Sequence, residues 1–239
     1  MLIYGHRGAR AEAPENTLAS FSRALQAGVD RVELDLHLAR DGELVVIHDP
    51  TLERTTNGRG KVARCDSKAL WALDARRAGP ECAEPQGVPT ITQVLDAFPA
   101  MRHYQLECKP AGPAERRKVA LCLLSLYTER NLYERATVTS FDPLLLAEVR
   151  RVAPEIPRGL VADRVRPDPV QTAVALGAWM VALDWRLCSE KRIAAAHAAG
   201  LHVSAWTVNK PDVARMLGER GLDSLITDVP TLMHAALAR

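Results

Sequence analysis

The feature that most limits how this chain can fold is a regular alternation of short apolar segments with helical patterns along almost its whole length. The apolar segments are rich in β-branched residues, and a helical spacing follows most of them. Eight such strand–helix units in 239 residues predict an α/β fold, the (β/α)8 TIM barrel. A doubly wound open sheet is the alternative. The predicted strands are residues 2–6, 31–37, 104–108, 136–141, 158–162, 179–184, 202–208 and 223–228.

Capping residues mark where several of the predicted helices begin and end. Leu18, Phe21 and Leu25 have helical spacing, and Gly28 stands where that helix should end. The segments 142–152 and 168–177 both open with Asp-Pro, a cap followed by proline at the first helical position. These capping residues support the strand–helix alternation independently of hydrophobicity.

One stretch, residues 38–103, departs from the alternation. Within it, residues 43–49 are predicted to form a strand that pairs back across an Arg-Asp-Gly turn. Residues 66–77 are predicted to form a short helix, and residues 79–89 a loop. We expect a single domain over residues 1–239, with a small insertion at about residues 50–90 between the second and third barrel strands.

Composition excludes several classes of protein. The 31 basic and 29 acidic residues nearly balance, which argues against a nucleic-acid partner. Five scattered cysteines form no C-x-x-C pair, so neither a disulfide framework nor a zinc site is expected. No segment has the length and hydrophobicity of a signal peptide or a membrane span. These features predict a soluble, cytoplasmic protein without stable membrane insertion. The sequence leaves open whether the protein is a monomer or a homodimer.

Ionisable residues gather where the predicted strands end, which is the face of a TIM barrel that carries active sites. In the second strand, Glu33 and Asp35 alternate with leucines and therefore share one face. In the third strand, Glu107 and Lys109 share a face in the same way. The other polar strand ends are His6-Arg7-Gly8, His48-Asp49, Ser140-Phe141-Asp142, Trp206 to Asn209, and Thr227-Asp228.

Three carboxylates, Glu33, Asp35 and Glu107, should then point into one barrel mouth. Buried like charges cost several kcal/mol unless they are neutralised. One divalent cation that prefers oxygen ligands, Mg²⁺, Ca²⁺ or Mn²⁺, would neutralise them. The alternative is a salt-bridge network with Arg7 and Lys109, although two bases leave three acids with a net negative charge.

The remaining charges around this predicted metal site suit a phosphoester substrate. His6 and His48 flank the carboxylates, and imidazole has the pKa that general acid–base catalysis near neutral pH requires. Arg7 and Lys109 provide two positive charges for a phosphate group. His37 is the last residue of the predicted strand 31–37, where a supporting role and a surface position are both open.

Several long motifs resemble those of the glycerophosphodiester phosphodiesterase family. They extend in family order from residue 6 to residue 230, and the first two are highly specific. The motifs are HRGARAEAPENTLASF (6–21), ELDLHLARDGELVVIHDPTLERTTNGRG (33–60), LECKP (106–110), SF (140–141), WTVN (206–209) and TDVP (227–230).

The resemblance implies a TIM barrel that uses a divalent cation to hydrolyse glycerophosphodiesters to sn-glycerol 3-phosphate and an alcohol. It implies Glu33, Asp35 and Glu107 as metal ligands, His6 and His48 as the acid/base pair, and Arg7 and Lys109 as phosphate ligands. Phe141 and Trp206 would wall the glycerol side of the pocket, with core packing as the alternative. Glu15 and Asn16 would cap the first helix or orient a catalytic histidine.

Two other functions remain open at this stage. A related barrel phosphodiesterase could act on lysophospholipids (lysophospholipase D-type), which should require an apolar groove at the barrel mouth. The loops 57–67 and 79–87 are polar and favour a small water-soluble diester. A non-catalytic phosphodiester-binding barrel should lack one of the site residues, and none is missing. The sequence leaves open which alcohol the substrate carries, which cation is bound, and which histidine is the acid and which the base. It also leaves open whether water or the glycerol 2-hydroxyl is the nucleophile.

Overall fold

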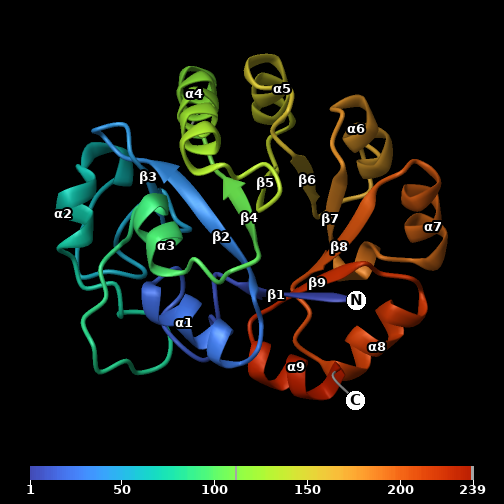
Figure 1. Ribbon diagram of the computed structural model, residues 1–239, viewed down its shortest axis with the longest axis horizontal. Helices are drawn as coiled ribbons and strands as arrows, with labels where there is room; N and C mark the ends of the chain where they lie inside the picture. The colour runs from blue at the N-terminus through green and yellow to red at the C-terminus, as the bar shows by residue number, and fades with distance from the viewer. Residues whose placement is uncertain (111, 238–239) are drawn as a thin grey trace.

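In the computed structural model, which describes residues 1–110 and 112–237, eight parallel strands close into a barrel (Figure 1). Adjacent strands pair in the order β1-β9-β8-β7-β6-β5-β4-β2, and a further pairing of β1 with β2 completes the ring. This confirms the predicted TIM barrel and excludes the open sheet, because an open sheet leaves two edge strands unpaired. The barrel strands are β1 (Leu2–His6), β2 (Arg31–Leu38), β4 (His103–Cys108), β5 (Ala136–Ser140), β6 (Arg158–Ala162), β7 (Met180–Asp184), β8 (His202–Trp206) and β9 (Ser224–Thr227).

The helices surround the barrel and cover the outer faces of the strands (Figure 1). The two predicted Asp-Pro helix starts are confirmed: the side chains of Asp142 and Asp168 each accept a hydrogen bond from a backbone N–H in the first turn, and Ser189 does the same at the start of α7. The helices are α1 (Leu18–Gln26), α2 (Ser67–Trp71), α3 (Ile91–Ala97), α4 (Pro113–Arg130), α5 (Pro143–Val152), α6 (Pro169–Ala175), α7 (Glu190–Ala198), α8 (Pro211–Glu219) and α9 (Pro230–Leu237), with short 3₁₀ turns at Val62–Arg64 and Trp185–Leu187.

The inserted segment follows a short strand, β3 (Leu44–Val46), which pairs antiparallel with the end of β2. This strand is shorter than the predicted 43–49. The predicted helix 66–77 is likewise reduced to α2, because the residues after Trp71 make backbone hydrogen bonds to other parts of the insertion. The segment has its own small apolar cluster, formed by Ala39, Val45, Ile47, Leu52, Val62, Leu70, Ala75 and Val88.

The helix α3 was not predicted from the sequence. It begins with a capping box, in which Thr90 accepts from the backbone N–H of Gln93 and the Gln93 side chain accepts from the backbone N–H of Thr90. The T-x-x-Q pattern was therefore a readable signal for this helix start.

Strand register fixes the relative positions of the ionisable residues. His6 lies beside Glu33 in the β1–β2 pair, and Asp35 lies beside Glu107 in the β2–β4 pair. Because these side chains occupy the same face of adjacent strands, they project into the barrel at its carboxyl-terminal end. Among the described residues, no helix is both long and apolar enough to cross a membrane.

Candidate active site

A cavity of about 290 Å³ opens at the carboxyl ends of the barrel strands. One side of it is charged and comes from β1, β2, β4 and the segments that follow β1, β3 and β4. The other side is mainly apolar and comes from the strands β5 to β9. The charged side includes His6, Arg7, Arg10, Glu33, His48, Glu107 and Lys109; the apolar side includes Phe141, Val161, Ala182, Trp206 and Ile226.

The three predicted carboxylates lie close together, and two of them, Glu33 and Glu107, line this cavity. Glu33, Asp35 and Glu107 each offer an oxygen atom, and these atoms lie within 4.8 Å of one another. Glu33 and Asp35 are buried, with 3% and 1% of their surface exposed. Such close packing of three acidic groups out of solvent requires compensating positive charge.

The protein's own cations provide only part of that charge. Nζ of Lys109 contacts Oδ1 of Asp35 at 3.1 Å and also donates to Oε1 of Glu107. Nε of Arg7 contacts Oδ2 of Asp35 at 3.1 Å. Glu33 differs: its Oε2 accepts the backbone N–H of Arg7 at 3.1 Å, while its buried Oε1 has no hydrogen-bond partner among the described residues. The salt-bridge alternative is therefore only partly realised.

This donor set fits a hard divalent cation. All three groups are carboxylates on adjacent strands, which is the ligand type that Mg²⁺, Ca²⁺ and Mn²⁺ prefer. The unpartnered Oε1 of Glu33 supplies an oxygen that no protein donor occupies. Glu33, Asp35 and Glu107 are accordingly the residues that could hold a metal ion.

Ionisation differs among the three acids for identifiable reasons. Burial raises the pKa of Glu33 well above its usual range, and the charges of Asp35 and Glu107 raise it further. Burial also raises the pKa of Glu107, against the effect of Lys109. For Asp35 burial is outweighed by Lys109 and Arg7, so its pKa is lowered. Glu33 is thus the acid whose ionised form the protein's own cations compensate least.

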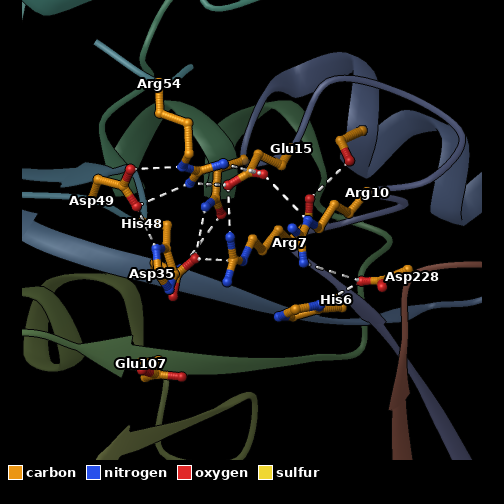
Figure 2. Close-up of polar contacts among 12 residues, drawn as sticks. His6, Arg7, Arg10, Glu15, Asp35, His48, Asp49, Arg54, Glu107 and Asp228 are labelled. Carbon is orange, nitrogen blue, oxygen red and sulfur yellow. Dashed lines mark hydrogen bonds and ion pairs between the residues drawn. The ribbon is translucent and has the colours of Figure 1, made fainter. Parts of the chain in front are cut away.

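Each of the two predicted histidines is held by its own aspartate (Figure 2). Nδ1 of His6 contacts Oδ1 of Asp228 at 2.5 Å, and Nδ1 of His48 contacts Oδ1 of Asp49 at 2.7 Å. An ionised carboxylate only accepts hydrogen bonds, so Nδ1 is the donor in both rings and Nε2 is the nitrogen left for chemistry. Burial lowers the pKa of His48, an effect that Asp35 opposes.

A third histidine, His37, contacts the backbone of His48. His37 belongs to β2 and is buried, so it does not have the surface position that the sequence left open. Its Nε2 lies 3.0 Å from the backbone oxygen of His48. Burial lowers the pKa of His37, so the neutral ring is favoured, with its Nε2–H donating to that carbonyl.

A chain of alternating charges connects the two His–Asp pairs (Figure 2). Glu15 is buried at its centre and contacts the guanidinium groups of three arginines. Arg7 Nη1 donates to Glu15 at 2.7 Å, and Arg10 Nε lies 3.3 Å from it. Arg54 joins Glu15 to Asp49, and Arg10 Nη1 lies 3.9 Å from Asp228.

Asn16 and Glu15 do not have the predicted capping role. The N-cap of α1 is Thr17, whose side chain accepts from the backbone N–H of Ser20. Asn16 instead donates from Nδ2 to Oδ2 of Asp35 at 2.8 Å. Asn16 thus orients a carboxylate, and Glu15 reaches His48 only through two intervening residues.

The charge on Glu15 should contribute measurably to stability. Burial alone would raise the pKa of Glu15, but Arg54 and Arg7 lower it to about 2. A carboxyl group with a lowered pKa in the folded state stabilises the fold above its unfolded pKa, and this contribution is lost as the pH falls toward 2. At pH 7 we expect the free energy of unfolding of Glu15→Gln, measured with urea, to be lower than that of wild type by on the order of 3 kcal/mol.

The difference between wild type and Glu15→Gln should shrink progressively between pH 4.5 and pH 2. Glu148→Gln is the matched control, because Glu148 also pairs with two arginines but on the surface of α5. The free energy of unfolding of Glu148→Gln should stay close to that of wild type. A Glu15→Gln variant as stable as wild type at pH 7 would contradict this description of the network.

A tight turn after β1 brings Arg7 to the cavity. Arg7 has a φ of 50°, a left-handed conformation that is uncommon for a residue with a side chain. Gly8 follows with a φ of 86°, and a Cβ there would lie 2.6 Å from the backbone of Ser20. The H-R-G sequence is thus needed for the path of the chain as well as for its side chains.

Phe141 and Trp206 form the aromatic part of the apolar side. Their rings meet edge to face, with centroids 5.5 Å apart. Phe141 remains 44% exposed, so it lies at the mouth of the cavity rather than in the core. Nε1 of Trp206 donates to the carbonyl of Ala182 at 3.2 Å, which fixes the indole.

Asp49, Asp228 and Arg54 had no predicted role, although both aspartates stand at predicted strand ends. Asp49 directly follows His48, and Asp228 closes the last strand, so position alone was a signal that both enter the mouth. The contact of Asp228 with His6 depends on the closed barrel, which brings β9 beside β1.

Several known proteins are similar to this chain in sequence and in fold over most of their length. The model of the glycerophosphoryl diester phosphodiesterase family matches residues 6–232. A glycerophosphodiester phosphodiesterase from Caldanaerobacter subterraneus subsp. tengcongensis is 32% identical over 231 residues, which cover 96% of this chain and 94% of that protein. One from Bacillus subtilis is 30% identical over 254 residues, covering 98% of this chain and 85% of that protein.

Among solved structures, a phosphodiesterase from Oleispira antarctica, in complex with the product sn-glycerol-3-phosphate, superimposes with a TM-score of 0.88 at 25% identity. The match covers 100% of this chain and 97% of that one. On the evidence of the family match and the 32% identity to a whole relative, this chain belongs to the glycerophosphoryl diester phosphodiesterase family.

Proposed function

We propose that this chain hydrolyses glycerophosphodiesters to sn-glycerol 3-phosphate and an alcohol, using His6 and His48 as a general acid–base pair and one divalent cation. The observation that carries the proposal is a single cavity in which two aspartate-bound histidines flank a cluster of three carboxylates and two cations. Family membership and the product bound to the Oleispira antarctica relative support the substrate class.

Glu33, Asp35 and Glu107 would hold the metal ion. When bound, a hard divalent cation supplies positive charge that stabilises the negative charge developing on the phosphoryl oxygens. Its preference for oxygen ligands favours Mg²⁺, Ca²⁺ or Mn²⁺ at this site.

Arg7 and Lys109 bind the phosphate group in this proposal. Both line the cavity, and both are already held by buried carboxylates, so their positive charges are oriented before substrate arrives. Preorganised charges of this kind stabilise a transition state without reorganisation during the reaction. Lys109 can exchange its contact with Glu107 for one with a phosphoryl oxygen.

His6 and His48 carry out the proton transfers through their Nε2 atoms. One imidazole takes the proton of the nucleophile, and the other gives a proton to the oxygen of the leaving alcohol. Asp228 and Asp49 keep each ring in the tautomer with a proton on Nδ1. The same pair serves either nucleophile, water or the glycerol 2-hydroxyl, the latter giving a cyclic phosphate that water then opens.

Phe141 and Trp206 would contact the glycerol carbons. The phosphate is drawn to the charged side of the cavity, so an organic arm of the substrate extends toward the apolar side. Aromatic faces suit the C–H surface of a small polyol and do not compete for its hydroxyl groups.

A second cavity supports a second candidate function, the hydrolysis of lysophospholipids. This cavity, of about 340 Å³, shares Phe141 and Val161 with the first. Its lining is mostly apolar and includes Pro143, Leu160, Ala162, Pro167 and Pro169. The polar loops in the insertion favour a small diester, whereas the β5–α5 and β6–α6 loops provide room for an apolar chain.

Measuring both substrates side by side separates these functions. We expect the purified chain, supplied with Mg²⁺, Ca²⁺ or Mn²⁺, to release sn-glycerol 3-phosphate from glycerophosphocholine and glycerophosphoethanolamine. A higher kcat/KM for lysophosphatidylcholine than for glycerophosphocholine would favour the second function. If neither substrate is cleaved with any of the three cations, the proposed function is wrong.

A further inference from the structure

Arg54 makes an unusual pair of contacts for a residue outside the barrel. It comes from the inserted segment, and its guanidinium bridges two carboxylates, each through both oxygens (Figure 2). The contacts to Asp49 are 2.6 Å from Nε and 3.0 Å from Nη2. Those to Glu15 are 2.9 Å from both Nη1 and Nη2. All three nitrogens of the fork are therefore used.

Arg54 connects a fixed point to a catalytic group. Glu15 is the fixed point, because it is buried and also bonded to Arg7. Asp49 is the movable end, because it is more exposed and lies on the loop after β3. The Oδ1 atom of Asp49 that accepts from Arg54 is the same atom that contacts Nδ1 of His48.

Arg54 has no place in the cavity itself. The described residues that line the cavity include His48 and Arg7 but not Arg54, Asp49 or Glu15. A change at Arg54 therefore alters no direct contact with a substrate in that cavity, and any effect must pass through Asp49 or Glu15.

We propose that Arg54 is a positioning residue for the reaction: anchored by Glu15, it fixes the Asp49 carboxylate that orients the His48 ring. This inference rests on the acid–base role proposed above for His48. Asp49 held at both oxygens cannot rotate, so His48 keeps its proton on Nδ1 and its Nε2 toward the substrate. The inserted segment thereby contributes to catalysis without touching the substrate.

Arg54→Lys is the most informative change. Lysine keeps the positive charge but has a single ammonium group, which cannot bind two carboxylates bidentately. We expect kcat for glycerophosphocholine to fall about 10- to 100-fold, with KM within about threefold of wild type. Glu15→Gln should instead affect both constants, because Glu15 also holds the phosphate-binding Arg7.

Arg76→Lys is the matched control. Arg76 lies in the same inserted segment and binds Asp74 through Nε and Nη2, both at 2.8 Å, away from either histidine. It should keep wild-type kcat and KM. A wild-type kcat in Arg54→Lys, or an equal loss in Arg76→Lys, would overturn the proposal.

A double-mutant cycle with Asp49→Asn tests the route of the effect. If Arg54 acts through Asp49, the double variant Arg54→Lys/Asp49→Asn should be no slower than the slower single variant. Losses that multiply would contradict this route.

The ¹⁵N chemical shifts of His48 provide a readout that does not depend on turnover. They should report a proton on Nδ1 in wild type and a tautomer mixture in Arg54→Lys, and an unchanged tautomer would overturn the proposal. If wild type cleaves no glycerophosphodiester, the proposed function fails, while this measurement still decides the role of Arg54.

Discussion

Replacing His48 or His6 with alanine is expected to lower kcat for glycerophosphocholine by about 10²- to 10⁴-fold. Each ring lines the cavity and is held at Nδ1 by an aspartate, which leaves Nε2 for the proposed proton transfer. Neither histidine belongs to the apolar core, and both variants should unfold at close to the wild-type temperature.

His197→Ala is the control for these two variants. His197 lies on α7, where its Nε2 contacts Asp223 at 2.9 Å, so the variant removes a comparable His–Asp pair far from the barrel mouth. It should retain wild-type turnover. If His6→Ala or His48→Ala also retains wild-type turnover, that histidine is not part of the acid–base pair.

Replacing Glu33 with glutamine is expected to abolish turnover and to stabilise the metal-free protein. The neutral amide replaces a carboxyl group whose ionisation is disfavoured by burial and by the charges of Asp35 and Glu107, and Glu33 is the one of the three that has no ion pair with Arg7 or Lys109. Relief of like-charge repulsion should raise the midpoint of urea unfolding in EDTA. Loss of a carboxylate ligand should remove the response to added cation.

Glu107→Gln separates metal binding from charge repulsion. Glu107 is paired with Lys109, so its replacement removes an attraction as well as a repulsion. We therefore expect Glu107→Gln to lose turnover without the gain in stability. A Glu33→Gln variant that is active, or that is less stable than wild type in EDTA, would contradict the proposed role of this cluster.

Much of the fold could be predicted because the barrel depends on patterns local to each unit. Apolar segments and Asp-Pro helix starts located every barrel strand and several helix starts. The insertion was harder, because its structure depends on hydrogen bonds between its own parts. Residues after Trp71 looked helical, but Ala75 donates to the carbonyl of Gln86 instead.

The residues of the candidate site were partly predictable for the same reason. The period of two along β2 places Glu33 and Asp35 on one face, and the order of the strands brings Glu107 beside them. The partner of His6 was not predictable, because Asp228 is 222 residues from His6 in the chain. Arg54 and Glu15 meet only because the insertion lies against the segment that follows β1.

The most direct test of the account is the cation dependence of sn-glycerol 3-phosphate release from glycerophosphocholine. Wild-type protein would be treated with EDTA, assayed, and assayed again after addition of Mg²⁺, Ca²⁺ or Mn²⁺. We predict that EDTA abolishes release and that at least one of these cations restores it in wild type but not in Glu33→Gln. Full release in excess EDTA, or restoration in Glu33→Gln equal to that in wild type, would contradict a metal-dependent reaction at the three carboxylates.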